Sequence, residues 1–284
     1  MAWVQSIQNA IDYIEEHLEE NLSIVSIAKQ ANASEYHFQR TFMILTDLSI
    51  GEYIRRRRLT LAAKEMTTTN CKVIDVAYKY GYDTPEAFSK AFRRQHGVSP
   101  SEARKYVGKL TFYERLKIQV ILKGAEPVKY NIIEREGFKV VGMKEEFSFA
   151  NGENLIGIPK MWNKANDNGT SSTLFKANNG QIKGVLGVCE ALNETQMNYW
   201  IAAEREGDTP EGYSSLDIPA SKWVVFEVHG AMPDAIQKVW KEIYSEWFPT
   251  SGYKHAGTPE LEVYPDGDPN CSSYYSEVWI PVLK

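Results

Sequence analysis

Polar side chains with paired hydrogen-bonding groups lie on one face of a short predicted helix in the first third of the chain. In residues 34–45 the phenylalanines recur at helical spacing and face inward, which leaves Tyr36, Gln39 and Arg40 facing outward. Glutamine can pair with adenine and arginine with guanine, each through two hydrogen bonds. The outward face of this helix can therefore contact base edges in a groove of the duplex.

A second face of the same kind follows in residues 84–94. Two phenylalanines one helical turn apart form its inward side, and its outward side carries Glu86, Lys90 and Arg93. Charged side chains on an exposed helix face can contact either phosphates or bases. This face could also enter a DNA groove.

Each of these two helices follows a shorter helix in the chain, and a sharp turn separates the two. Before the second helix, Gly81 supplies the positive φ of the turn, Thr84 caps the helix and Pro85 takes its first position. Before the first helix, the turn falls at residues 32–33 and Ser34 is the cap. Corresponding residues of the two copies lie 49 or 50 positions apart, so the chain contains two helix-turn-helix units.

A longer helix is predicted between the two units, starting near Gly51. About 17 residues at ~1.5 Å each form a rod of roughly 25 Å, which can hold two recognition helices about one DNA turn, ~34 Å, apart. The arginines at 55–58 lie on this helix at steps of ~100°. We expect one or two of them to contact phosphate, and salt bridges to Glu52 or Glu65 are the alternative. The sequence thus predicts an N-terminal all-α domain with two helix-turn-helix units joined by a long helix.

This part of the chain resembles the AraC/XylS family of transcriptional regulators. The resemblance covers roughly residues 5–108 and includes an Ile-Asp-Val-Ala opening at Ile74, a Gly-Tyr-Asp turn at Gly81 and a Gly-x-Ser-Pro step at Gly97. It implies binding to double-stranded promoter DNA in the major groove, with RNA polymerase as a candidate second partner. The DNA-contacting residues that follow from it are Tyr36, Gln39, Arg40, Glu86, Lys90, Arg93 and Arg94.

The second recognition helix departs from the family pattern. Pro85 and Glu86 stand at positions where close relatives carry amides, so direct base reading by this helix stays open. Lys90 can reach a base or a phosphate, whereas Arg93 and Arg94 are expected to position the phosphate backbone. Two reading units in one chain remove the usual need for a dimer, so we expect a monomer.

Charge is divided unevenly along the chain. The net charge of the 284 residues is −5, yet residues 21–110 hold 15 Lys+Arg against 8 Asp+Glu, and residues 111–284 hold 17 against 24. The helical part is therefore basic, as DNA binding requires. No run of 18 apolar residues and no secretory signal occurs, so we expect a cytoplasmic protein without a membrane partner. The three cysteines and five histidines lack metal-ligand spacing, and neither metal nor cofactor is predicted.

The second half of the chain changes from helical to alternating periodicity. It reads as two copies of a strand, a helix and two strands, which predicts a C-terminal α+β domain of two βαββ repeats with antiparallel sheet. The predicted elements are strands at 139–147, 182–188 and 199–203 with a helix at 158–165, then strands at 223–228, 260–264 and 274–280 with a helix at 233–247. The chain is thus divided into a DNA-binding domain at 1–110, a linker at 111–125 and a second domain at 126–284.

The second domain resembles the GyrI-like effector-binding domain. The resemblance depends on residues 218–223, 247–253, 259–264 and 276–282, and the order of the two domains is Rob-like. It implies a cleft in which an acidic residue and aromatic rings hold hydrophobic cations. The chain therefore combines a predicted DNA-binding domain with a predicted sensor of small molecules.

In two of its strands, 260–264 and 274–280, alternation places a glutamate and an aromatic residue on a shared face. A carboxylate beside rings attracts an organic cation, so a cationic, aromatic effector is expected. The alternative is that both glutamates lie on the solvent-exposed face of the sheet. Trp240 is a further candidate for the cleft, although a tryptophan at helical spacing more often lies in the core. The predicted ligand-binding residues are Glu262, Tyr264, Glu277, Trp279, Trp223 and Phe147.

Two other functions stay open beside that of a regulator. Some GyrI-like proteins hydrolyse small molecules with a glutamate and aromatic residues, so the resemblance also allows a hydrolase. No Ser/His/Asp order, phosphate loop or metal spacing occurs in the sequence, and we predict a protein that is not an enzyme. The third class is an adaptor that docks another protein on its second domain.

Overall fold

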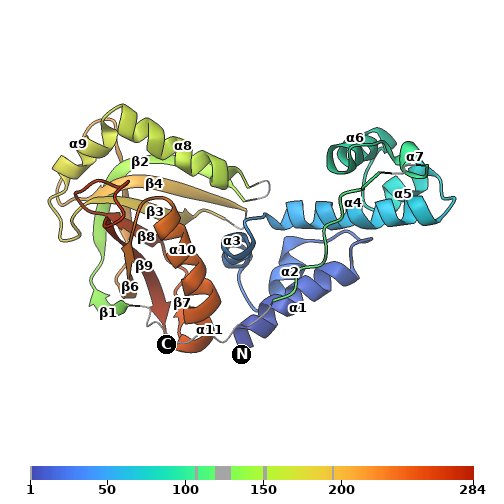
Figure 1. Ribbon diagram of the computed structural model, residues 1–284. Coiled ribbons are helices and arrows are strands. Elements are labelled where there is room, and N and C mark those ends of the chain that lie inside the picture. The colour runs from blue at the N-terminus through green and yellow to red at the C-terminus, as the bar shows by residue number, and fades with distance from the viewer. Residues whose placement is uncertain (1, 106–107, 119–128, 150–151, 194) are drawn as a thin grey trace. The chain divides into compact units, whose positions relative to one another are not determined.

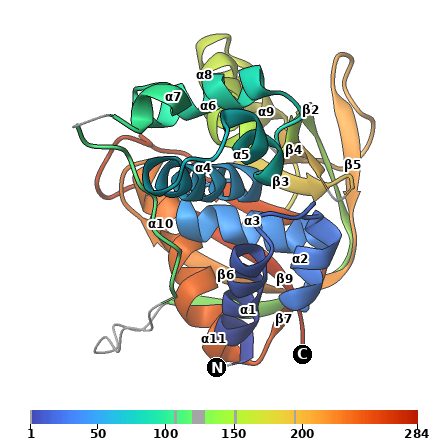
Figure 2. The same ribbon diagram turned by 90° about the vertical axis from the view of Figure 1, so that its right-hand side faces the viewer.

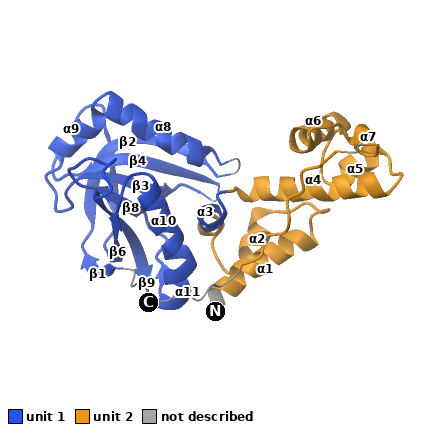
Figure 3. Cartoon of the chain, in the orientation of Figure 1, with its two compact units in different colours: residues 1, 39–47, 122–284 blue, residues 2–38, 48–121 orange. Residues whose placement is uncertain are grey.

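The computed structural model describes residues 2–105, 108–118, 129–149, 152–193 and 195–284. Two compact units are present (Figure 3). The helical unit consists of residues 2–38 and 48–121, and the sheet unit consists of residues 39–47 and 122–284 together with residue 1. None of the described helices is long and apolar enough to cross a membrane.

Seven helices occur in the described part of the N-terminal region. They are α1 (Ala2–Glu16), α2 (Ile24–Gln30), α3 (Glu35–Thr46), α4 (Ile50–Thr68), α5 (Val73–Lys79), α6 (Pro85–His96) and α7 (Pro100–Ala103). The pairs α2–α3 and α5–α6 are the two predicted helix-turn-helix units, and α4 is the predicted long helix between them. Helix α3 belongs to the helical unit up to Phe38 and to the sheet unit from Gln39 onward.

The second helix-turn-helix unit forms through the predicted turn and cap. Gly81 adopts a φ of +75°, and the Thr84 hydroxyl accepts a hydrogen bond from the Ala87 amide at 3.2 Å. Phe88 and Phe92 are fully buried in a core that the second half of α4 shares with α5, α6 and α7. Figures 1 and 2 show these three helices gathered at one end of α4. The exposed side of α6 is thereby held at a set position on the unit.

The sheet unit contains one antiparallel sheet of nine strands in its described residues, in the order β1-β6-β9-β8-β3-β4-β2-β5, with β7 beside β9. The strands are β1 (Tyr130–Arg135), β2 (Phe138–Ser148), β3 (Val185–Ala191), β4 (Gln196–Glu204), β5 (Ser214–Ile218), β6 (Ser221–His229), β7 (Lys254–His255), β8 (Glu260–Tyr264) and β9 (Tyr275–Leu283). The helices are α8 (Glu153–Asp167), α9 (Thr170–Ala177), α10 (Asp234–Glu242) and α11 (Phe248–Ser251), with a π-helix (Ile243–Trp247) between α10 and α11.

The two predicted βαββ repeats are confirmed as β2-α8-β3-β4 and β6-α10-β8-β9. Helix α9 and strands β1, β5 and β7 were not predicted. Strand β1 precedes the first repeat but pairs with β6 of the second, and β5 precedes the second repeat but pairs with β2 of the first. The two repeats therefore exchange edge strands. The side chains of β1 are mostly exposed, so β1 carries little of the alternation that marks a half-buried strand.

The predicted linker at 111–125 lies only partly within the described residues. Residues 111–118 belong to the helical unit and form hydrogen bonds with its helices α1 and α4, while 119–125 and the first residues of the predicted second domain, 126–128, lie outside the described ranges. The division at residue 110 stays a prediction.

The cap of α6 gives a test of how this helix is held. Replacing Thr84→Ala removes the acceptor for the Ala87 amide, and we expect a local loss of about 1 kcal/mol. Hydrogen exchange of the α6 amides should then be faster by about fivefold. Ser89→Ala, in the middle of the same helix, is the matched control and should leave these rates nearly unchanged. Equal rates in the two variants would contradict the capping role.

Candidate functional site

The carboxylate of Glu262 lies at the centre of a group of polar aromatic side chains in the sheet unit. Tyr199 and Tyr264 donate hydrogen bonds from their hydroxyls to Oε2, at 2.6 and 3.1 Å. Trp240 Nε1 donates to Oε1 at 2.8 Å. Trp162 Nε1 donates to the Tyr199 hydroxyl at 2.8 Å, and its ring lies 5.0 Å from that of Tyr264, edge to face. We call these five residues the Glu262 cluster.

Strands and helices of both repeats build this cluster. Glu262 on β8 stands opposite Gly187 on β3, while α8 supplies Trp162 and α10 supplies Trp240. A Cβ atom at Gly187 would lie 2.2 Å from the Tyr199 hydroxyl and 2.7 Å from Glu262 Oε2. Glycine is therefore needed here for the carboxylate to meet its donors.

The donors around Glu262 are neutral. Burial, and then the charge of Glu262, raise the pKa of the Tyr199 and Tyr264 phenols well above the ordinary value, so both stay protonated and donate. No ion pair among the described residues involves Glu262, although three donors hold its carboxylate. Hydrogen bonds from neutral groups satisfy the oxygens but leave the negative charge in place.

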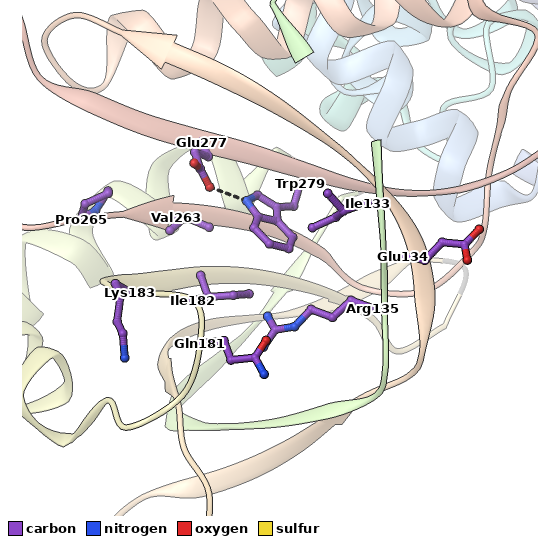
Figure 4. A pocket seen from close by; sticks show the side chains of 10 residues that line it. All are labelled: Ile133, Glu134, Arg135, Gln181, Ile182, Lys183, Val263, Pro265, Glu277 and Trp279. Carbon is purple, nitrogen blue, oxygen red and sulfur yellow. Dashed lines mark hydrogen bonds between the residues drawn. The ribbon is translucent and has the colours of Figure 1, made fainter. Parts of the chain in front are cut away.

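Glu277 and Trp279, predicted to share the ligand site with Glu262, lie on the opposite face of the sheet. In the pairing of β8 with β9, Glu262 stands opposite Val278, and successive side chains of a strand alternate between faces. There, Glu277 and Trp279 help to line a separate pocket of about 490 Å³ (Figure 4). Trp279 Nε1 donates to Glu277 Oε2 at 2.7 Å. The expectation of one site that contains both glutamates is wrong.

Charges of both signs line this second pocket. Its charged lining residues are Glu134, Arg135, Lys183 and Glu277, and its apolar ones include Ile133, Ile182, Val263 and Trp279. Arg135 pairs with Glu204 at 2.5 Å, and Figure 4 shows its side chain beside Gln181. The pocket therefore differs from the Glu262 cluster, whose central carboxylate has no ion-pair partner among the described residues.

The other two predicted ligand residues are buried. Trp223 is fully buried, and its ring lies 5.9 Å from that of Trp279 on the face of the pocket. Phe147 lies on the face of the Glu262 cluster, beneath α8, where a Cβ at Gly157 would come within 2.2 Å of its ring. Neither residue forms a contact with Glu262 in the described structure.

Sequence reasoning missed Trp162 and Tyr199, and it gave Trp240 as a candidate for the cleft with a place in the core as the alternative. Trp240 is indeed buried, but its indole nitrogen donates a hydrogen bond to the Glu262 carboxylate. One signal was available, because Trp162 and Trp240 occupy the helices of the two matching repeats. A tryptophan on each repeat helix points to a shared site between the repeats.

The predicted DNA contacts on α6 are exposed. Glu86, Lys90, Arg93 and Arg94 all lie on the surface of the helical unit. Arg93 forms an ion pair with Glu102 at 3.6 Å, but both side chains are more than half exposed, and such a pair contributes little. This face is accessible for contact with phosphates.

The predicted contacts on α3 are less exposed. Tyr36 is half-buried, and Gln39 and Arg40 are 7% and 8% exposed. Within the sheet unit, Arg40 forms an ion pair with Glu260, and its guanidinium carbon lies 4.7 Å from the centroid of the Trp240 ring. Burial favours protonation of Glu260, but the Arg40 charge and hydrogen bonds lower the pKa of this carboxyl to about 2. Base reading by Arg40 requires that this ion pair open.

Three of the arginines at 55–58 have carboxylate partners. Arg55 and Arg56 both pair with Glu52, the predicted alternative to phosphate contact, and Arg57 pairs with Glu15. Contact of this segment with phosphate stays a prediction.

Comparison with known proteins identifies both halves of the chain. Residues 27–106 match a helix-turn-helix domain model, and residues 131–282 match that of the integron-associated effector binding protein. SoxS, a regulatory protein of Salmonella typhimurium, is 41% identical over 104 residues, which are 37% of this chain and 97% of SoxS. AarP, an HTH-type transcriptional activator of Providencia stuartii, is 43% identical over 95 residues, 34% of this chain and 70% of AarP.

A solved structure resembles the sheet unit. The structure of SAV2435 bound to tetraphenylphosphonium is 28% identical, with a TM-score of 0.51, over 55% of this chain and 94% of that one. Both resemblances expected from the sequence are thus confirmed. The chain belongs to the AraC family of transcriptional regulators and carries, as its C-terminal domain, a GyrI-like member of the integron-associated effector-binding family.

Proposed function

We propose that this regulator senses a hydrophobic organic cation at the Glu262 cluster and binds promoter DNA through both helix-turn-helix units. The observation that carries the proposal is the state of Glu262. Three neutral donors hold its carboxylate, and no ion pair within the described ranges compensates its charge. The Arg40 guanidinium lies over the Trp240 ring but is paired with Glu260. A partly buried carboxylate that has no ion-pair partner of its own is an attractive site for a cation that also buries apolar surface.

The aromatic rings of the cluster favour the same class of ligand. A cation over the face of tryptophan or tyrosine gains about 0.5–2 kcal/mol. One face of the Trp240 ring is covered by the Arg40 guanidinium, so the rings of Trp162, Tyr199 and Tyr264 are the ones proposed to contact the ligand cation. Tetraphenylphosphonium, with which SAV2435 was solved, combines a positive charge with apolar rings and is a suitable probe.

The pocket on the other face of the sheet is the second candidate. It offers the Trp279 ring and the Glu277 carboxylate, but Arg135 and Lys183 also line it. These two basic residues are matched by two acidic ones, Glu134 and Glu277, so the lining has no net negative charge to attract a cation. We therefore favour the Glu262 cluster.

For the helical unit we propose major-groove contacts through α3 and phosphate contacts through α6. RNA polymerase is a proposed further partner, and the cytoplasm, where promoter DNA lies, is the proposed location. We also propose a binding role rather than a catalytic one, in keeping with the regulators SoxS and AarP. Ester hydrolysis that depends on Glu262 would favour the hydrolase alternative.

Glu262→Gln tests the ligand site. The amide keeps the shape of the side chain and removes its charge, so we expect tetraphenylphosphonium to bind more weakly by about 1–3 kcal/mol. Binding of triphenylphosphine oxide, a neutral analogue, should change little. Isothermal titration calorimetry with both compounds measures the difference.

The matched control is Glu277→Gln, which makes the same change on the opposite face of the sheet. We expect this variant to bind the cation as the wild type does. If Glu277→Gln weakens binding and Glu262→Gln does not, the ligand occupies the pocket of Figure 4 and the assignment to the Glu262 cluster is wrong.

Arg40→Ala and Arg94→Ala test the DNA contacts. Loss of Arg40 should cost about 1–3 kcal/mol on the preferred sequence and relax the choice of base at one position. Loss of Arg94 should lower the affinity for all DNA sequences alike, and it should reduce the salt dependence of binding by about one phosphate contact. Binding of each variant to a library of duplexes at several salt concentrations separates the two. If both variants lose affinity equally for all duplexes, Arg40 contacts only phosphate and does not read a base.

A further inference from the structure

Residues 111–118, here called the strap, follow α7 and contain neither helix nor strand. They belong to the helical unit. Contacts of the strap involve α6, then α4, then α1, in the order of the chain. The strap therefore meets helices from both ends of the helical unit.

The first contacts of the strap are with α6. Gln95 Nε2 donates to the carbonyl oxygen of Thr111 at 3.4 Å, and it also donates to the Thr60 hydroxyl of α4 at 3.2 Å. The Phe112 ring lies 6.2 Å from that of His96. The start of the strap is thus joined to the recognition helix of the second helix-turn-helix unit.

The middle of the strap is bound to α4 through Tyr113. Its backbone amide donates to the Thr60 hydroxyl at 3.1 Å, and its carbonyl oxygen accepts from Arg57 Nη1. The guanidinium carbon of Arg56 lies 4.6 Å from the centroid of the Tyr113 ring. Both backbone groups of this residue are therefore satisfied by side chains of one helix.

The end of the strap reaches the start of the chain. The Leu116 amide donates to the Tyr53 hydroxyl of α4 at 3.2 Å, and the Ile118 amide donates to Gln8 Oε1 of α1 at 2.9 Å. Arg115 also forms an ion pair with Asp12 of α1. Helix α1 packs on α2 of the first helix-turn-helix unit.

The groups that receive the strap are themselves buried and ordered. Tyr53, Arg57 and Thr60 are 3%, 6% and 0% exposed. The Tyr53 hydroxyl donates to Glu15 Oε1 at 2.6 Å, and Arg57 donates to both oxygens of the same carboxylate at 2.7 and 2.8 Å. The strap is therefore attached to the buried ion pair that joins α1 to α4.

We propose that the strap fixes the distance and rotation of α6 relative to α1 and α2 within the helical unit, so that the protein distinguishes DNA sites by the spacing between two contacted blocks. The inference rests on the proposed binding of DNA by both units. One extra base pair shifts the second block by ~3.4 Å and rotates it by ~35° about the helix axis. A rigid pair of units loses contacts on such a site, whereas a loosely joined pair adapts to it.

The test uses the full chain and a duplex that the wild-type protein selects from a random pool, with its contacted blocks located by footprinting. The double variant Leu116→Pro and Ile118→Pro removes the two amide donors at the end of the strap. The matched control, Glu114→Pro and Lys117→Pro, adds the same two rings at exposed positions whose amides form none of the hydrogen bonds described above. Tyr53→Phe is a milder variant that removes only the hydroxyl, should the prolines prevent folding.

We expect a one-base-pair insertion to lower the affinity of the wild type and of the control by about tenfold or more, as for the loss of a specific base contact. In the strap variants this penalty should fall to about threefold or less, with affinity for the original site largely kept. An unchanged penalty in the strap variants would overturn the inference. A wild type that tolerates the insertion would also overturn it while leaving DNA binding intact, and failure to select any duplex would instead contradict the proposed function.

Discussion

A charge taken out of water must be compensated, and this constraint shapes both units of the protein. In the helical unit, Arg57 and Glu15 form a buried pair through two hydrogen bonds. Removing one partner of such a pair costs about 3–5 kcal/mol, because the other charge is left buried. The pair joins α1 to α4, and the remaining guanidinium nitrogen binds the carbonyl of Tyr113. Residues far apart in the chain are thereby held around the long helix that separates the two helix-turn-helix units.

The same constraint distinguishes two carboxylates of the sheet unit. Glu204 is buried, and both of its carboxylate oxygens have partners. It forms an ion pair with Arg135 and accepts a hydrogen bond from the Ile182 amide at 2.8 Å. Glu262 has donors around it but no cation within the described ion pairs. Compensation by a basic residue stabilises a fold, whereas compensation by neutral donors alone leaves a charge for a ligand to neutralise. The difference between these two glutamates is the physical basis of our proposal that the effector binds at the Glu262 cluster.

The pleat of the sheet decides which side chains can act together. Glu262 and Glu277 lie on neighbouring strands, but a shift of one residue in register is enough to put them on opposite faces. Glu262 therefore accepts a hydrogen bond from Trp240 directly and is linked to Trp162 through Tyr199, whereas Glu277 faces a pocket that also contains arginine and lysine. This separation gives two sites of different electrostatic character in one domain.

The sequence by itself determined the helix-turn-helix units, because a glycine turn at Gly81 and a cap at Thr84 act within a few residues of where they stand. It also determined the two βαββ repeats and the pairing of Glu262 with Tyr264, which share a face of one strand. Tertiary structure alone decided the rest. The bond between Tyr199 and Glu262 joins residues 63 positions apart, and the exchange of β1 and β5 between repeats depends on which strands pair. Alternation within one strand determines only which of its own side chains share a face of the sheet. Which aromatic rings lie near each glutamate depends on how strands far apart in the sequence pair with one another.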